Sequence, residues 1–218
     1  VLYGGPGGLG NARARSFSLA SASIPGSPED GDRFGRSLAA GDFNRDGRAD
    51  LAVGVPGDAS GAGSVVVLLG SASGLTASGA RLLQQGTGGL PGASEAGDAF
   101  GGSLAAGDLN GDGFAELVVG APGEGVGSSA PGAGALTVLQ GSASGPVAAT
   151  ARIWHQDSTG VPGGAESNDQ FGASLTVGDL DGDGYGDLAV GVPGETIGRL
   201  LGAGKIGRAS CGERVEIS

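Results

Sequence analysis

A 27-residue segment occurs three times without gaps in this chain, and this repeat limits the possible folds more than any other feature of the sequence. The copies are DRFGRSLAAGDFNRDGRADLAVGVPGD from Asp32, DAFGGSLAAGDLNGDGFAELVVGAPGE from Asp98 and DQFGASLTVGDLDGDGYGDLAVGVPGE from Asp169. Their starts lie 66 and 71 residues apart, and each copy is followed by Gly-Ala-Gly. Such self-similarity is typical of architectures in which small units bury their faces against their neighbours.

Each unit is predicted to contain four short strands joined by glycine-rich turns. In the first unit we expect strands at residues 37–40, 51–55, 65–69 and 81–85, because Gly, Ser and Asp bound the apolar runs there. The opening VLYGGPGGLG matches the end of a third strand and its turn, so the repeat region extends over residues 1–204. Four strands per unit predict an all-β fold, a β-propeller with about three four-stranded antiparallel blades.

Phenylalanine occupies the same position of every repeat, at Phe34, Phe100 and Phe171, and each time glycine follows it. A large ring beside a residue without a side chain suits packing between tapering sheets whose backbones approach closely. We therefore assign these rings a structural role.

Composition and charge exclude several classes of function. The longest aliphatic run, residues 65–69, is far too short to cross a bilayer, so this segment is not expected to insert into a membrane. The net charge of −11 argues against nucleic acid as a partner. The first residues carry neither an initiator Met nor a signal segment, so we expect them to be interior to a longer protein.

Each repeat contains a loop with oxygen-bearing side chains at positions 1, 3, 5 and 9, a glycine at position 6, and a residue at position 7 that can offer its backbone carbonyl. Alternate oxygens on a tightly wound loop converge on one point, which suits a hard cation, and the glycine permits the sharp turn. The predicted ligands at positions 1, 3, 5, 7 and 9 are Asp42, Asn44, Asp46, Arg48 and Asp50; Asp108, Asn110, Asp112, Phe114 and Glu116; and Asp179, Asp181, Asp183, Tyr185 and Asp187.

These loops differ from an EF-hand, which closes with a bidentate Glu at position 12. Position 12 is valine in all three copies, so the acid at position 9 must close the site instead. The loops contribute ten carboxylates to a chain whose net charge is −11. The alternative is a set of solvated Asx-rich turns. Three copies in register favour calcium, with up to three Ca²⁺ ions per chain.

The combination of Phe-Gly, the acidic loop and Gly120-Ala121-Pro122 resembles the FG-GAP repeat of integrin α-subunit propellers and their bacterial relatives. The resemblance implies a ring of seven blades, with calcium in the loop between the first two strands of a blade. Gly-Ala-Pro becomes Gly-Val-Pro in the first and third repeats, centred on residues 32–58 and 169–195; the second is centred on residues 98–124. Three units where the family has seven imply a fragment.

Residues 205–218, KIGRASCGERVEIS, depart from the repeat, because a hydrophobic strand is expected after Gly204. They contain the only Lys and the only Cys of the chain, and the string resembles a translated sequencing-library adapter. We interpret them as a non-native tail that packs against nothing; the alternative is a genuine strand. On this interpretation the last blade ends after Ala203, and disulfide counting does not apply.

Enzyme chemistry finds little support in the sequence. The single histidine, His155, lies in a weak predicted strand with Asp157 two residues on, but no serine outside the repeat stands out as a nucleophile. Ser37, Ser103 and Ser174 recur with the repeat and are interpreted as structural. We therefore expect a non-enzymatic scaffold.

The resemblance implies a protein or glycan ligand on the face opposite the acidic loops, and adhesion or ligand binding as the function. The alternative is the non-catalytic propeller of a larger secreted hydrolase, as in phospholipase-D-like proteins with such repeats. Short exposed loops bind calcium weakly, so we expect an extracellular location, secreted or at the cell surface.

Overall fold

The computed structural model describes residues 1–209 and has thirteen strands and one short helical turn in that range. The elements are β1 (Tyr3–Gly5), β2 (Gly8–Gly10), β3 (Leu38–Gly41), β4 (Asp50–Val55), α1 (Asp58–Gly61), β5 (Ser64–Leu69), β6 (Thr76–Leu83), β7 (Ser103–Gly107), β8 (Glu116–Ala121), β9 (Ala135–Gln140), β10 (Val147–Trp154), β11 (Ser174–Gly178), β12 (Asp187–Val192) and β13 (Lys205–Ala209). The expected all-β class is confirmed.

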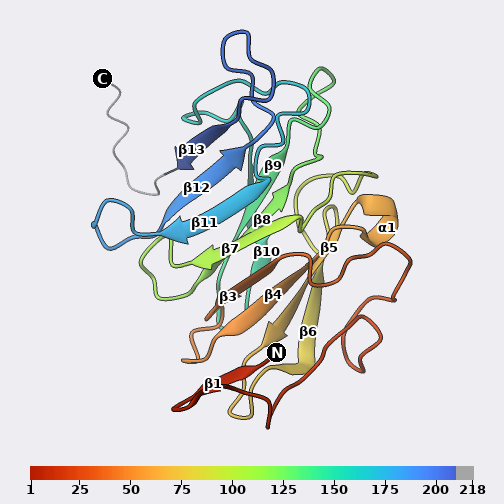
Figure 1. Ribbon diagram of the computed structural model, residues 1–218, viewed down its shortest axis with the longest axis vertical. Helices are drawn as coiled ribbons and strands as arrows, with labels where there is room; N and C mark the ends of the chain where they lie inside the picture. The colour runs from red at the N-terminus through yellow and green to blue at the C-terminus, as the bar shows by residue number, and fades with distance from the viewer. Residues whose placement is uncertain (210–218) are drawn as a thin grey trace.

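The strands form four antiparallel sheets (Figure 1). Blade 1 has the order β3-β4-β5-β6, blade 2 the order β7-β8-β9-β10 and blade 3 the order β11-β12-β13, while β1 and β2 form a hairpin. The first strands of the three blades lie side by side, since β7 contacts both β3 and β11. This is the arrangement expected of adjacent propeller blades.

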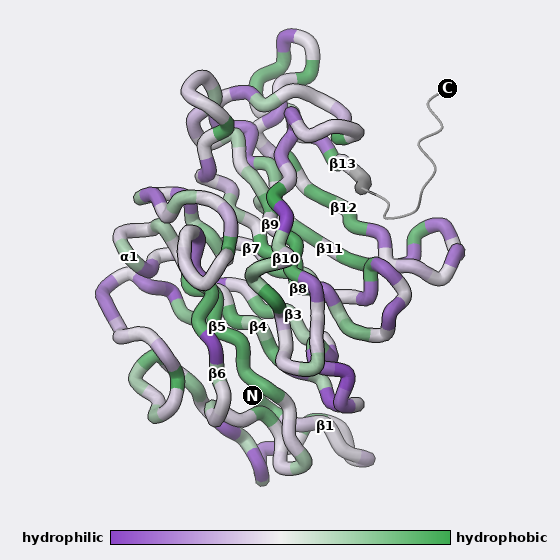
Figure 2. Tube along the Cα trace, turned by 180° about the vertical axis from the view of Figure 1, so that it is seen from behind, coloured by the Kyte–Doolittle hydropathy of each residue, from purple (hydrophilic) through white to green (hydrophobic). Residues whose placement is uncertain are grey.

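The second and third strands of blades 1 and 2 are buried on both faces. Along β5, Val65 and Val67 pack into the core between blades 1 and 2, while Val66 and Leu68 pack against residues 17–24 on the other face. Successive side chains of a strand point to opposite faces, so a strand between two cores has to be apolar throughout. Figure 2 shows hydrophobic residues along the strands and hydrophilic residues in the loops.

Backbone contacts between the Gly-Ala-Gly of one blade and the Phe-Gly of the next fix the junctions between blades. Phe100 N–H donates to Ala62 O at 2.9 Å, and Phe171 N–H donates to Ala133 O at 2.8 Å. A Cβ on Gly63 would lie 2.2 Å from Phe100 O, so only glycine permits this approach. The Phe100 and Phe171 rings are 0% and 4% exposed, in agreement with a packing role.

The repeated serines also have a packing role at these junctions. Ser37 Oγ donates to Gly101 O at 2.6 Å, and Ser103 Oγ donates to Gly172 O. Each hydroxyl therefore ties the first strand of its blade to the Phe-Gly turn of the next blade.

The strand predictions hold for the first three strands of blade 1, within one residue at each end. The fourth strand runs over residues 76–83 instead of 81–85, and a register shift interrupts its pairing with β5 between Val67 and Leu69. This strand begins with Thr-Ala-Ser-Gly, whose small and polar side chains leave no apolar pattern to read.

The expected break after Ala203 is wrong for the described residues, because β13 (Lys205–Ala209) pairs with β12 over five residues. The expectation that residues 205–209 pack against nothing is therefore also wrong. A backbone ladder needs no particular side chains, which is why the departure from the repeat did not reveal it. Residues 210–218 lie outside the described range, and a non-native origin of residues 205–218 stays a prediction.

Blade 3 consequently has three strands in the described range, one more than a break after Ala203 would leave. Within residues 1–209, no helix has the length and apolarity needed to cross a lipid bilayer.

Candidate functional site

The three acidic loops join the first and second strands of their blades and lie at one end of the sheets. We call residues 42–50 loop 1, residues 108–116 loop 2 and residues 179–187 loop 3. The carboxylate at position 1 organises each turn: Asp108 Oδ1 accepts the N–H of Gly111 at 2.7 Å, and Oδ2 accepts the N–H of Gly113 at 2.8 Å. The glycines at position 6 have φ between +81° and +91°, a conformation that other residues rarely adopt.

The acid at position 9 closes each loop from the strand side. Glu116 Oε2 accepts the N–H of Leu109, the second loop residue, at 2.8 Å; the corresponding bonds are 3.1 Å in loop 1 and 2.9 Å in loop 3. Asp50, Glu116 and Asp187 are 1%, 2% and 4% exposed. Each loop therefore has one buried carboxylate behind a set of exposed ones.

The buried acids are electrostatically unfavourable as anions. Burial raises the pKa of Asp50 and Glu116; backbone N–H bonds oppose the rise, and the carboxylates at positions 1 and 5 add to it. Like charges at ~4 Å repel by roughly 1 kcal/mol in water and about 4 kcal/mol near a protein surface. A bound cation would offset this repulsion.

Loop 3 brings three carboxylates together. Asp179, Asp181 and Asp187 each offer an oxygen, and these oxygens lie within 4.8 Å of one another. Asp183 instead accepts the N–H of Tyr185 at 2.9 Å. Loops 1 and 2 have Asn in place of Asp181, and these amides accept the N–H of the residue at position 5, at 3.1 and 2.8 Å. Such an all-oxygen donor set fits Ca²⁺ or Mg²⁺.

Contacts between neighbouring loops form a continuous row, a feature that the repeat alone did not reveal. Ala115 N–H donates to Asp42 O at 3.0 Å, and Gly186 N–H donates to Asp108 O at 2.9 Å. Arg45 of loop 1 donates to the Asp112 carbonyl at 2.8 Å and lies 5.6 Å from the centre of the Phe114 ring. Hydrogen bonds thus join each acidic loop to the loop of the neighbouring blade.

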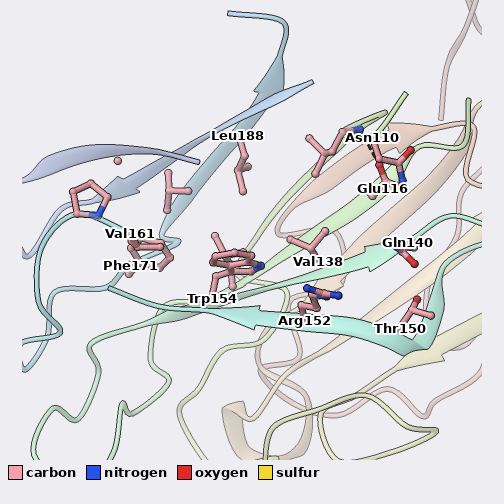
Figure 3. A pocket seen from close by; sticks show the side chains of 15 residues that line it. Asn110, Glu116, Val138, Gln140, Thr150, Arg152, Trp154, Val161, Phe171 and Leu188 are labelled. Atoms are coloured by element: carbon pink, nitrogen blue, oxygen red, sulfur yellow. Dashed lines mark hydrogen bonds between the residues drawn. The ribbon is translucent and has the colours of Figure 1, made fainter. Parts of the chain in front are cut away.

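A mostly apolar cavity of about 240 Å³ lies between blades 2 and 3. Trp154, Val161 and Phe171 line one end, and Asn110 and Glu116 of loop 2 lie at the other (Figure 3). Asn110 Nδ2 donates to Glu116 Oε1 at 3.2 Å. An apolar wall therefore borders the buried acid of loop 2.

His155 and Asp157 do not form a catalytic pair in this structure. Asp157 Oδ1 accepts the N–H of Ala165 at 2.9 Å. His155 Nδ1 is buried and has no hydrogen-bond partner within residues 1–209.

The FG-GAP repeat model matches residues 34–68, 100–139 and 171–209, each a segment that contains one acidic loop. The chain belongs to the FG-GAP repeat family. These repeats indicate a β-propeller, and the side-by-side antiparallel sheets agree with it, so the predicted fold class is confirmed.

Two kinds of relatives share the FG-GAP region. The chain is 32% identical to integrin alpha-PS2 of Drosophila melanogaster over 178 residues, 79% of this chain and 11% of the relative. It is 31% identical to integrin alpha-5 of Xenopus laevis over 173 residues, 75% of this chain and 14% of the relative.

The other kind is an enzyme by name. Phosphatidylinositol-glycan-specific phospholipase D of Rattus norvegicus is 33% identical over 165 residues, 74% of this chain and 18% of the relative. The FG-GAP chain spans less than a fifth of the length of each of these relatives.

Sequence reasoning missed a second repeated acidic set at the opposite end of the blades. Every FG-GAP unit has an acid three residues before the aspartate that opens the repeat, and another acid as the final residue of the repeat. These residues are Glu29, Asp32 and Asp58; Glu95, Asp98 and Glu124; and Glu166, Asp169 and Glu195. The first acid of each set lies outside the 27-residue repeat, and the three acids lack the alternate spacing that identifies a single loop.

Proposed function

We propose that this chain is a calcium-stabilised segment of an extracellular propeller that serves as an adhesion or ligand-binding scaffold. One observation carries the proposal: three loops in register place oxygen-bearing side chains in front of a buried acid that ties the loop to its strand, and in loop 3 three of the carboxylates lie close together. Calcium in each loop would link the first two strands of a blade. Its role here is structural.

All fifteen predicted ligands fit this proposal by position. The side chains at positions 1, 3, 5 and 9 supply carboxylate or amide oxygens, and the carbonyls of Arg48, Phe114 and Tyr185 supply the oxygen at position 7. The Arg48 guanidinium lies 3.5 Å from Asp46 Oδ2 and competes for that carboxylate. Loop 1 should therefore bind most weakly, and loop 3, with four carboxylates, most tightly.

The scaffold role rests on the integrin α relatives and on the charge of the chain. A net charge of −11 disfavours nucleic acid, so we expect a protein or glycan ligand on the face opposite the loops. Weak loop sites fill only where calcium is abundant, at Kd values of about 10⁻⁴–10⁻³ M for extracellular modules, which favours a secreted or cell-surface protein.

The phospholipase D relative supports a second candidate, the non-catalytic propeller of a secreted hydrolase. The complete reading frame distinguishes the two candidates, because an attached hydrolase domain favours the second.

Calcium titration of the chain by calorimetry tests the proposal. We expect saturable binding in the millimolar range or tighter, reduced by Asp112→Ala and Asp183→Ala. Variants that bind as many ions as the unmodified chain would contradict the proposal and leave the loops as solvated turns.

A further inference from the structure

The junction between blades 1 and 2 holds a second group of oxygen ligands, at the end of the sheets opposite loop 2. Glu95, Asp98 and Glu124 each offer a carboxylate oxygen, and these oxygens lie within 4.8 Å of one another. Gln85, which follows β6 of blade 1, donates from Nε2 to Glu124 Oε2 at 2.6 Å. We call these four residues the junction cluster.

Local backbone bonds hold the acids in place. Asp98 Oδ2 accepts the N–H of Glu95 at 2.7 Å, and Gly123 N–H donates to Asp98 O at 3.0 Å. The first bond closes the turn before β7, and the second attaches this turn to the segment after β8. Two separate loops of blade 2 are thereby fixed against each other, with their carboxylates on the same side.

The cluster concentrates negative charge in a partly buried place. Asp98 is 3% exposed, and burial raises its pKa. Burial also raises the pKa of Glu124; the bond from Gln85 opposes this rise, and the charges of Asp98 and Glu95 add to it. The ion pair recorded within residues 1–209 joins Arg48 and Asp46, far along the chain. No basic side chain among these residues forms an ion pair with the cluster.

The amide of Gln85 points independently to a ligand. Its side chain is 98% buried, and Oε1 has no hydrogen-bond partner within residues 1–209. Oε1 belongs to the same amide group as Nε2, which contacts Glu124 Oε2 at 2.6 Å, so the unpartnered oxygen lies in the group that touches the junction cluster. A buried carbonyl oxygen without a partner is costly, and the cost disappears when a cation accepts the lone pair.

The next junction repeats this arrangement with one instructive difference. Gln156 is also 98% buried, donates to Glu195 and leaves its Oε1 without a partner in the described part of the chain. There, burial raises the pKa of Asp169, the backbone bond from Glu166 opposes the rise, the charge of Glu195 adds to it, and the charge of Lys205 opposes it. The second junction thus has a positive charge nearby, whereas no basic side chain within residues 1–209 opposes the raised pKa of Asp98 or Glu124 at the first.

We propose that the junction cluster binds a hard divalent cation between blades 1 and 2. Its ligands are the carboxylates of Glu95, Asp98 and Glu124 and the carbonyl oxygen of Gln85. Four oxygen donors with three negative charges suit Ca²⁺, Mg²⁺ or Mn²⁺ and exclude soft metals. The cation links the two blades at the end opposite the loops. The competing explanation is a proton on Glu124 that is shared with the Gln85 amide.

A crystal of the unmodified chain grown with Mn²⁺ tests the site directly through anomalous scattering. We expect a peak between the three carboxylates, in contact with Gln85 Oε1. Peaks at the acidic loops without one in the junction cluster overturn this inference and leave the proposed function intact. A map without peaks at either place overturns both.

Variants provide a second test in solution, with bound Mn²⁺ counted by equilibrium dialysis. We expect Glu124→Gln and Gln85→Leu each to lower the count by one ion, as Asp108→Ala should do at loop 2. Gln85→Glu is the decisive variant, because a fourth carboxylate should lower the melting temperature in chelator and raise it with Mn²⁺. A rise of its melting temperature with Mn²⁺ that is no larger than that of the unmodified chain supports the shared proton and overturns the cation site.

Discussion

Replacement of Glu116 by Gln separates the electrostatic role of the loop from its hydrogen bonding. The side chain is 2% exposed, accepts the Leu109 N–H at 2.8 Å and lies near the charges of Asp112 and Asp108. Glutamine keeps an acceptor for the Leu109 N–H and removes the charge. In calcium, the variant lacks a charged carboxylate ligand for the ion. In chelator, the variant is relieved of the repulsion between Glu116 and the charges of Asp112 and Asp108.

The expected changes in melting temperature follow from the lost calcium binding and from the relieved repulsion. One calcium site at a hundredfold excess over Kd contributes about 2.7 kcal/mol to the free energy of unfolding. For a chain of this size, 1 kcal/mol corresponds to about 2–4 °C in melting temperature. We therefore expect Glu116→Gln to lower the melting temperature by about 5–10 °C in calcium. In chelator the relief of repulsion offsets the loss of the bonds that Glu116 accepts from Asn110 and Gly141, so the change stays within about 1 kcal/mol.

Differential scanning calorimetry in calcium and in chelator measures both shifts. Asp30→Asn is the matched control, because Asp30 is an exposed acid outside both acidic sets and its loss should shift neither melting temperature appreciably. Equal decreases for Glu116→Gln in calcium and in chelator would refute the reasoning, since the carboxylate would then act only as a hydrogen-bond acceptor.

Three further predictions concern the loops and the junctions. Asp183→Ala should remove the tightest calcium-binding step and Asp46→Ala the weakest; calorimetric titrations in which the two variants lose the same step would contradict this order. Gly134→Ala should lower the melting temperature sharply, because a Cβ there would lie 2.4 Å from Phe171 N, whereas Gly125→Ala meets nothing closer than 3.9 Å and should be nearly neutral. Truncation after Gly204 removes one of the two strands that pair with β12 and should lower the melting temperature by several degrees; an unchanged value would show that residues 205–209 do not contribute to the fold.

The sequence predicted the blade because every unit repeats the same apolar runs between glycines. It also predicted the three acidic loops, since their spacing is local; that their oxygens bind calcium stays a prediction. The contact of Gly63 with Phe100 could not be read from the sequence, although both residues belong to visible motifs, because only the packed blades bring them together. The early start of β6 was missed for another reason: pairing with β5, and not apolar pattern, fixes that strand.

The junction cluster could not be predicted from the sequence either, because its residues come together only in the folded blades. Glu95, Asp98 and Glu124 are separated by up to 29 residues and meet only when the ends of β7 and β8 are adjacent. Gln85 comes from the preceding blade, and nothing in the residues around it signals that its amide will be buried.

The central claim is that calcium stabilises the blades through their loops, and the melting temperature of the unmodified chain in millimolar calcium and in chelator tests it most directly. We expect a higher melting temperature in calcium, since each filled loop adds up to about 2.7 kcal/mol to the free energy of unfolding at a hundredfold excess over Kd. A melting temperature that is the same in calcium and in chelator would contradict the account.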